Sequence, residues 1–294
     1  MEKIRIGTRA SRLALWQAEF VARILQKNFS VEIVKIQTTG DKILDAPLAK
    51  IGGKGLFTKE IENALAAGRI DLAVHSLKDV PSELPAGFEI AAITPRENPF
   101  DAFVSNKFDS LEDLPSGGVV GTSSLRRAAQ ILNLRPDLRI ENLRGNVDTR
   151  LKKLDAGNFD AVILAAAGLE RLGYGARIKK ILTEIIPAAG QGALAIEIRA
   201  GDAEIRDAVK ILHDEKTSAA VRIERDFLKK IGGSCQIPVG VFARVDADKI
   251  IVRAVIASTD GKKILRETAE DTSGESLAEK MLVGGGCEIL SGLT

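Results

Sequence analysis

The chain has 294 residues, 45% of them hydrophobic, and its 42 basic and 40 acidic side chains leave a net charge of only +2. That length suggests two or three domains, while near-neutral charge and 4% aromatic content argue against nucleic-acid binding through bulk charge or base stacking. Because no apolar run approaches the roughly 18 residues of a membrane span, we expect a soluble, cytoplasmic protein with no membrane or nucleic-acid partner.

The chain begins with a predicted strand at 4–6 and an amphipathic helix at 13–26. Between them, residues 7–12 read Gly-Thr-Arg-Ala-Ser-Arg, and a glycine turn with hydroxyls before a helix start presents free N–H groups to an anion. Arg9 and Arg12 oppose the helix dipole there unless a bound anion neutralises them. Surface arginines beside a Ser11 cap are the alternative, and the sequence leaves both interpretations open.

A second strand is predicted at 31–37, followed by a loop that runs to Phe57. The part of this loop from 47 to 57 carries three glycines, together with lysines, and lacks apolar periodicity, which predicts a mobile segment that acts as a lid. It lacks the spacing of a phosphate-binding P-loop. Residues 56–67 then have helical spacing, and Gly68 ends that helix.

The stretch 70–81 opens as an apolar strand and turns polar abruptly at His75, Ser76, Lys78 and Asp79 before Pro81 stops it. In open α/β sheets, ligands bind beyond the carboxyl ends of the strands. These four side chains therefore predict a site. The plain alternative is a solvated strand end with a surface ion pair.

Residues 94–100 contain two prolines among polar residues, which indicates a hinge before a strand at 101–104. Residues 119–127 then repeat the pattern of the N-terminus, with a strand, Gly-Thr, hydroxyls and two arginines at a helix start, and predict a second anion site. A second internal similarity aligns residues 65–74 with 154–163; in both segments a helix ends at a glycine before a strand begins. Because the two similarities occur in the same order along the chain, they predict two α/β units of similar architecture.

Residues 185–195 contain a G-x-G-x-x-A pattern, but a proline breaks the preceding strand and a strand-like alternation follows. We therefore reject dinucleotide binding and interpret the segment as a second crossing between domains. From His213 onward, a helix at 217–230, three strands and a helix near 277–282 predict a smaller α+β domain. Cys235 lies in a loop there, better placed for chemistry than Cys287. Two cysteines without a CxxC pair and two histidines make a metal site improbable.

Six motifs follow one another along the chain: GTRAS at 7–11, LAKIGGKGLF at 48–57, HSLKDVP at 75–81, GTSSLRR at 121–127, LRGNV at 143–147, and ER at 224–225 leading to GSCQIP at 233–238. In this order they resemble the porphobilinogen deaminase family, also called hydroxymethylbilane synthases, over nearly the whole chain.

The resemblance implies an α/β enzyme with two periplasmic-binding-protein-like domains that form a clamshell, and a small α+β C-terminal domain. The implied domains are 1–94 with 190–211, then 95–189, then 212–294. It also implies condensation of four porphobilinogen molecules, with loss of ammonia, on a dipyrromethane cofactor bound to Cys235 through a thioether. A cytoplasmic monomer of haem biosynthesis is expected.

The site residues implied by the resemblance fall into three groups. The catalytic residues are Asp79, Lys78 and Arg9. The cofactor-binding residues are Cys235, Lys78, Asp79, Thr122, Ser123, Ser124, Arg126, Arg127, Arg144 and Gly145. The substrate-binding residues are Arg9, Ser11, Lys50, Phe57, Ser76, Arg144, Arg150, Arg171 and Gln191. Each pyrrole carries an acetate and a propionate, so the arginines would pair with carboxylates.

Two other function classes stay open at this point. A non-catalytic clamshell protein that binds a small polycarboxylate would share the first two domains but would need neither Asp79 nor a cysteine-bearing domain. A nucleic-acid binder would use the arginines but should be more basic and more aromatic. Covalently bound pyrrole on the purified chain would distinguish the three.

Overall fold

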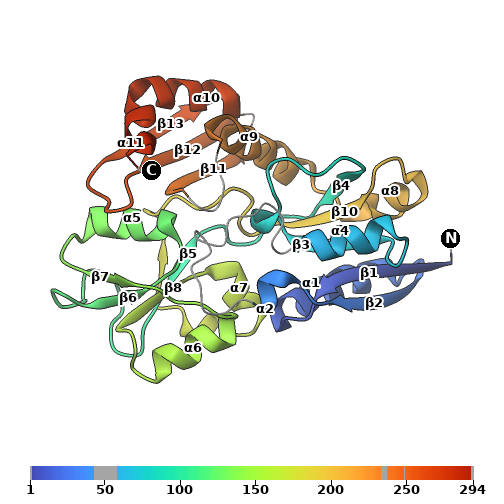
Figure 1. Ribbon diagram of the computed structural model, residues 1–294, viewed down its shortest axis with the longest axis horizontal. Helices are drawn as coiled ribbons and strands as arrows, with labels where there is room; N and C mark the ends of the chain where they lie inside the picture. Colours follow the sequence, from blue (N-terminus) through green and yellow to red (C-terminus); the bar gives the residue numbers. More distant parts are fainter. Residues whose placement is uncertain (1, 43–57, 233–236, 248, 293–294) are drawn as a thin grey trace. The chain divides into compact units, whose positions relative to one another are not determined.

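A computed structural model describes residues 2–42, 58–232, 237–247 and 249–292 (Figure 1). These residues form two compact units, one made of 2–42, 58–97 and 192–219 and the other of 98–191 and 220–292. The chain thus leaves the first unit near the two prolines that suggested a hinge and returns to it at Gly192. The division into three domains with the boundaries given above stays a prediction.

The first unit contains a five-stranded sheet in the order β2-β1-β3-β10-β4 (Figure 1). Its strands are β1 Lys3–Arg9, β2 Ser30–Ile36, β3 Leu72–Ser76, β4 Phe88–Ile93 and β10 Leu194–Arg199. β1 runs parallel to β2 and β3, whereas β10 is antiparallel to β3 and β4. The helices are α1 Arg12–Leu25, α2 Thr39–Lys42, α4 Lys59–Ala66, α8 Ala203–Val209 and the short η1 Leu77–Asp79 and η3 Lys210–Leu212.

Parallel strands require a crossover connection, and α1 supplies the one between β1 and β2. Its residues Ala18, Val21 and Leu25 recur at helical spacing and are buried against the β-sheet core that includes Ile4 and Ile6. The apolar stripe that predicted this helix therefore packs against β1. This packing holds β1 in place, and so positions the polar residues that follow β1.

The second unit contains a five-stranded sheet in the order β7-β6-β8-β5-β9. Its strands are β5 Asp101–Val104, β6 Val119–Gly121, β7 Arg139–Glu141, β8 Ala161–Ala165 and β9 Lys180–Leu182. Its helices are α5 Leu125–Leu134, α6 Val147–Asp155, α7 Ala166–Arg171 and the short η2 Gly175–Arg177.

The two five-stranded sheets have the same strand order and directions, which confirms the predicted repeat. In each sheet the first three strands are parallel and the fourth is antiparallel to both of its neighbours. That fourth strand, β10 in one and β5 in the other, lies close in sequence to a crossing between the units. The two glycines that end the equivalent helices, Gly68 and Gly157, have φ of +64° and +79°, a conformation that L side chains rarely adopt.

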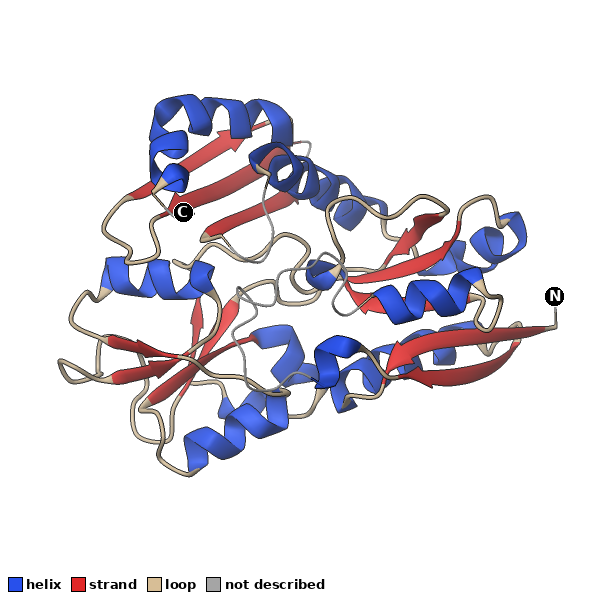
Figure 2. Cartoon of the chain, in the orientation of Figure 1, coloured by secondary structure: helices blue, strands red, loops and turns tan. Residues whose placement is uncertain are grey.

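The same unit contains a three-stranded antiparallel sheet of β11 Val239–Asp246, β12 Lys249–Ala257 and β13 Ile264–Glu270. The associated helices are α9 Glu215–Ile231, α10 Gly274–Met281, η4 Leu282–Gly286 and α11 Cys287–Ser291 (Figure 2). Alternate residues of β11 point to opposite faces, so Val241 joins the helix-covered core while Phe242 packs with Ile186 and Phe100. The predicted small C-terminal α+β domain is thus confirmed.

The fold is α/β, with a small C-terminal sheet domain, as the sequence predicted. Within the part of the chain that the structure describes, no helix is both long and apolar enough to cross a membrane.

Candidate active site

The polar residues of the first unit gather at the carboxyl ends of β1 and β3. The two strands are parallel neighbours, so the segments that follow them meet at one edge of the sheet. Arg9 ends β1, Ser11 follows it, and Ser76 and Asp79 lie at and beyond the end of β3. All four of these predicted residues line one pocket, together with Leu13, Ala14, Gln17, Thr58, Val74 and His75.

Two hydrogen bonds fix the hydroxyl groups of this pocket. The Ser11 side chain caps α1 by accepting a hydrogen bond from the Ala14 amide at 3.3 Å. The Ser76 hydroxyl accepts a hydrogen bond of 2.8 Å from Nε2 of Gln17. Gln17 is 3% exposed and was not predicted as a site residue. A polar side chain within the apolar stripe of α1 is the signal that could have identified it.

Asp79 is exposed and Lys78 is half-buried in the one-turn helix η1. The turn is held by its apolar residues, because Leu77 and Val80 are buried and the Leu77 amide donates to the carbonyl of Ala193 at 3.0 Å. The Asp79 carboxylate is therefore presented at the pocket on a short, anchored turn, where it can meet a ligand and exchange protons with it.

A buried polar cluster adjoins this pocket through His75, which lines the pocket. Nε2 of His75 lies 2.8 Å from Oε2 of Glu197, and both side chains are nearly or fully buried. Glu62 of α4 is buried too, and desolvation raises the pKa of its carboxyl, an effect that the nearby Thr58 hydroxyl opposes, the charge of Glu197 strengthens and His75 opposes. Sequence reasoning identified His75 as polar at the strand end but did not identify the two glutamates.

The second unit repeats this arrangement at the carboxyl ends of β6, β7 and β8. Thr122, Ser123 and Ser124 follow β6, Arg144 and Gly145 follow β7, and Arg171 ends the helix that follows β8. The Thr122 amide donates to the Glu141 carbonyl at 3.0 Å, and the Ser123 hydroxyl lies within hydrogen-bond distance of the Leu143 carbonyl. The structure thus brings the predicted hydroxyl and arginine segments of this unit to one sheet edge.

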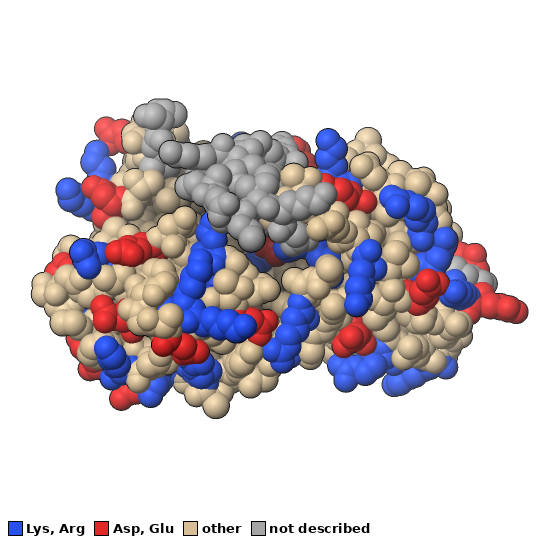
Figure 3. All heavy atoms as spheres, turned by 60° about the horizontal axis from the view of Figure 1, so that its bottom comes forward, with Lys and Arg blue, Asp and Glu red and all other residues tan. Residues whose placement is uncertain are grey.

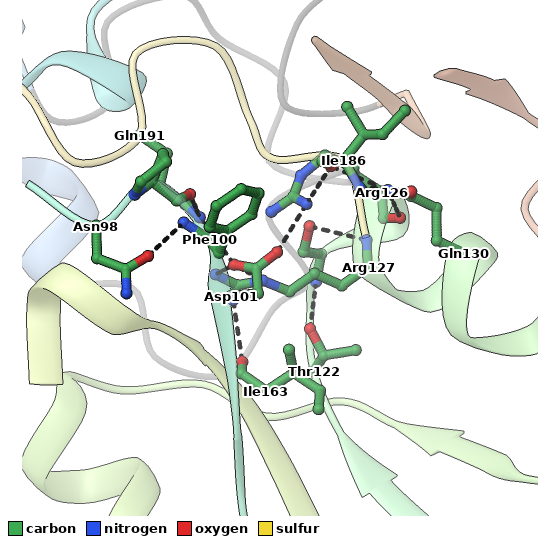
Figure 4. A network of polar contacts seen from close by, with 12 residues as sticks. Asn98, Phe100, Asp101, Thr122, Arg126, Arg127, Gln130, Ile163, Ile186 and Gln191 are labelled. Carbon is green, nitrogen blue, oxygen red and sulfur yellow. Dashed lines mark hydrogen bonds and ion pairs between the residues drawn. The ribbon is translucent and has the colours of Figure 1, made fainter. Parts of the chain in front are cut away.

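Arg126 and Arg127, in the first turn of α5, are each only 6% exposed and pair with Asp101, which is fully buried (Figure 4). Nη1 of Arg126 donates to Oδ2 at 2.8 Å, and Nε and Nη2 of Arg127 donate to Oδ1 at 3.0 and 2.6 Å. Burial alone would raise the pKa of the Asp101 carboxyl, but the two guanidinium groups more than offset it and hold that pKa well below its usual range.

The sequence argument for an anion beside this helix start did not include Asp101. The chain itself supplies one carboxylate to the two arginines, so a bound ligand is not required to bring a negative charge there. One carboxylate balances only one of the two guanidinium charges. Gln191, predicted to bind substrate, is buried here as well and donates to Oδ1 of Asp101 at 2.9 Å and to the Pro99 carbonyl at 2.7 Å.

The donors of the second unit fit a ligand that carries carboxylates. Nη1 of Arg144 is buried and has no hydrogen-bond partner among the described residues, which is costly for a charged group unless a ligand accepts from it. Nε of Arg150 donates to the Gly145 carbonyl at 2.8 Å. At Gly145, φ is +112° and a Cβ would lie 2.7 Å from Thr149, so a side chain is excluded beside Arg144.

Some predicted site residues lie outside the described part of the chain, namely Lys50, Phe57 and Cys235. The other cysteine, Cys287, is exposed. Among the described residues, no group of three or more His, Cys, Asp or Glu is arranged to hold a metal ion.

Comparison with known proteins finds two family models that together match most of the chain. Residues 4–207 match "Porphobilinogen deaminase, dipyromethane cofactor binding domain", and residues 218–284 match "Porphobilinogen deaminase, C-terminal domain". Curated relatives named porphobilinogen deaminase include the proteins of Thiobacillus denitrificans, 52% identical over 100% of this chain and 99% of the relative, and of Maridesulfovibrio salexigens, 51% identical over 99% and 98%.

Solved structures with a similar backbone are more distant. A nutrient-binding protein from Burkholderia cenocepacia bound to methionine is 17% identical, with a TM-score of 0.46 over 77% of this chain and 95% of that one. A likeness at that level carries no argument about what this chain binds.

Proposed function

Because this chain belongs to the porphobilinogen deaminase family, we propose that it condenses four porphobilinogen molecules head to tail into hydroxymethylbilane, in tetrapyrrole and haem biosynthesis. The observation that carries this proposal is the match of the two family models to residues 4–207 and 218–284. Each condensation releases one ammonia, and hydrolysis releases the linear product.

The substrate's carboxylates account for the basic side chains at the two sheet edges. In the first unit, Arg9, Ser11 and Ser76 would receive the acetate and propionate groups of incoming porphobilinogen. Lys50 and Phe57, which lie outside the described residues, are proposed to bind the substrate as well. In the second unit, Arg144, Arg150 and Arg171 would hold further carboxylates. The buried Nη1 of Arg144, which has no partner within the described part of the chain, supports this role. Gln191 would contribute through its amide.

Asp79 is the residue that we propose for the chemical step. Loss of ammonia from porphobilinogen leaves a cationic azafulvene, and a carboxylate near the pyrrole nitrogen stabilises that developing charge. The same carboxylate can transfer a proton to the leaving amine and accept one from the attacked ring carbon. Its exposure on an anchored turn beside Arg9 is consistent with both roles. Lys78 would contribute positive charge next to it.

The dipyrromethane cofactor supplies the terminal pyrrole to which the first substrate is joined, and we propose that it is attached to Cys235 through a thioether. The residues proposed to bind it are, in the second unit, Thr122, Ser123, Ser124, Arg126, Arg127, Arg144 and Gly145, and, in the first unit, Lys78 and Asp79. The chemistry of this donor set supports the proposal, since hydroxyls, a helix N-terminus and guanidinium groups all bind carboxylates.

We further propose that the protein is a cytoplasmic monomer that binds neither nucleic acid nor membrane. Acidic and basic side chains are interspersed on the face seen in Figure 3, which supports a small-molecule ligand over a long polyanion.

Incubation of the purified chain with porphobilinogen tests the activity. We expect porphobilinogen to disappear, one ammonia to appear for each molecule consumed, and a linear tetrapyrrole to form that cyclises and oxidises to a uroporphyrin. A protein that only binds a polycarboxylate would retain porphobilinogen unchanged, and that result would refute the proposed activity.

A further inference from the structure

Asp101 is the point at which three segments of the second unit meet (Figure 4). It begins β5, and its carboxylate accepts hydrogen bonds from both arginines of the α5 first turn and from Gln191. It is a carboxylate at the start of an otherwise apolar strand and is fully buried. A carboxylate in such a place requires charged partners, because burial without them is strongly unfavourable.

Further contacts fix the two guanidinium groups in single orientations. Nη1 of Arg126 also donates to the Ile186 carbonyl at 2.8 Å, and Nη1 of Arg127 donates to the Ile163 carbonyl at 3.0 Å. Gln130 adds to this arrangement, since its Nε2 donates to the Ile186 carbonyl and its Oε1 accepts from the Ile186 amide. Of the five N–H donors of Arg127, the described structure uses three, two on Asp101 and one on Ile163.

We propose that Asp101 is a positioning residue for the cofactor: it orients Arg126 and Arg127 to receive the cofactor's carboxylates without touching the cofactor itself. This inference rests on the proposed function, in which the two arginines bind dipyrromethane. A guanidinium held in place before a ligand arrives loses less conformational freedom on binding than a mobile one does. Without Asp101, two buried cations in one helix turn would repel each other and turn away from their present orientation.

The proposal is tested on apo-protein prepared without porphobilinogen, by following its covalent loading through intact mass after porphobilinogen is added. Asp101→Asn keeps the shape of the side chain but removes its charge. We expect it to load at least tenfold more slowly than wild type and to need more porphobilinogen for half-maximal loading. Asp137→Asn is the matched control, because Asp137 pairs with Arg135 on the partly exposed surface of the same unit. It should load at the wild-type rate.

A double-mutant cycle separates positioning from a general structural role. If Asp101 acts through the arginines, Asp101→Asn should slow loading less in the Arg127→Gln background than in wild type, because only Arg126 is then left for it to orient. A purely structural Asp101 would instead lower the melting temperature while the folded chain loaded at the wild-type rate. Should Asp101→Asn not fold, the double variant should still load more slowly than Arg127→Gln, because Arg126 has lost its carboxylate partner.

Two results would overturn the inference: loading of Asp101→Asn within twofold of wild type, or an Asp101→Asn effect at least as large in the Arg127→Gln background as in wild type. Failure of the wild-type apo-protein to load at all would instead refute the proposed function. The two failures are therefore distinguishable.

Discussion

The amide of Gln17 donates a hydrogen bond of 2.8 Å to the hydroxyl of Ser76, although 59 positions separate the two residues. This contact connects the first turns of α1 to the end of β3 and so connects the two segments that line the pocket of the first unit. It leaves the Ser76 hydroxyl free to direct its own hydrogen toward a carboxylate, since the hydroxyl is the acceptor in this bond.

Loss of this contact should weaken substrate binding. We expect Gln17→Ala to raise KM for porphobilinogen about fivefold, which corresponds to the roughly 1 kcal/mol that one such hydrogen bond contributes, with kcat nearly unchanged. Steady-state kinetics would measure both. Glu19→Gln, on the exposed side of the same helix, is the control and should behave as wild type. An unchanged KM in Gln17→Ala would show that the contact does not orient Ser76 for binding.

Asp79→Asn should fold normally, because the side chain is exposed, and should retain its cofactor through the proposed thioether to Cys235. If the carboxylate stabilises the developing cation, turnover should fall by about 10² or more. Rate measurements on preparations with matched cofactor content, verified by intact mass, would test this. A variant that turned over within a few-fold of wild type would exclude Asp79 from the chemical step.

Arg9→Leu should keep the cofactor but stall chain elongation, because we place Arg9 in the substrate pocket of the first unit. Native mass spectrometry after a pulse of porphobilinogen would show whether successive substrate units accumulate on the protein. Arg12→Leu, at the exposed start of α1, serves as the control and should elongate normally. Normal elongation in Arg9→Leu would contradict the assignment.

Glu62 gives a prediction about pH and stability. Burial raises the pKa of its carboxyl in the folded state above the value in the unfolded chain, about 4.3. The folded state therefore binds this proton more tightly than the unfolded state does. The contribution of the protonated carboxyl to the stability of the folded state is fully present below the unfolded pKa and is lost as pH rises through the folded pKa. We therefore expect the melting temperature of Glu62→Gln to increase relative to that of wild type as pH rises from the unfolded pKa to the folded pKa of Glu62. Above the folded pKa, the difference between the two proteins should stay constant.

Thermal unfolding of the two proteins across a pH series would measure this difference. Glu19→Gln, at an exposed position, should show no such dependence on pH. A Glu62→Gln difference that did not change with pH would mean that the Glu62 carboxyl has the same proton affinity in the folded and unfolded chains.

Local sequence patterns predicted most of the elements, because an apolar stripe or alternation is visible within a few residues. The strand predicted at 101–104 is β5 Asp101–Val104, and the helix predicted at 13–26 is α1 Arg12–Leu25. The hydroxyl-rich helix starts were also found in sequence, since Ser11 and Ser124 both cap the helices that follow them.

Partnerships between distant residues could not be predicted in this way. Arg126 and Arg127 were recognised as an anion site, but the carboxylate that they contact lies 25 and 26 positions earlier, across the sheet. His75 and Glu197 are 122 positions apart and meet only because β10 returns to pair with β3. The sequence shows a polar residue beside or within an apolar strand, which indicates that the residue needs a polar partner. Only the folded sheet shows which residue that partner is.

The central claim, a covalent primer on Cys235, is tested most directly by the intact mass of the purified protein. Only a thiolate attacks an electrophilic methylene efficiently, and the chain has two cysteines. We predict that wild type is heavier than its sequence by one dipyrromethane. Cys235→Ser should have the bare sequence mass and make no tetrapyrrole, whereas Cys287→Ser should keep both adduct and activity. An unmodified mass for wild type, in a preparation that actively makes tetrapyrrole, would contradict the claim.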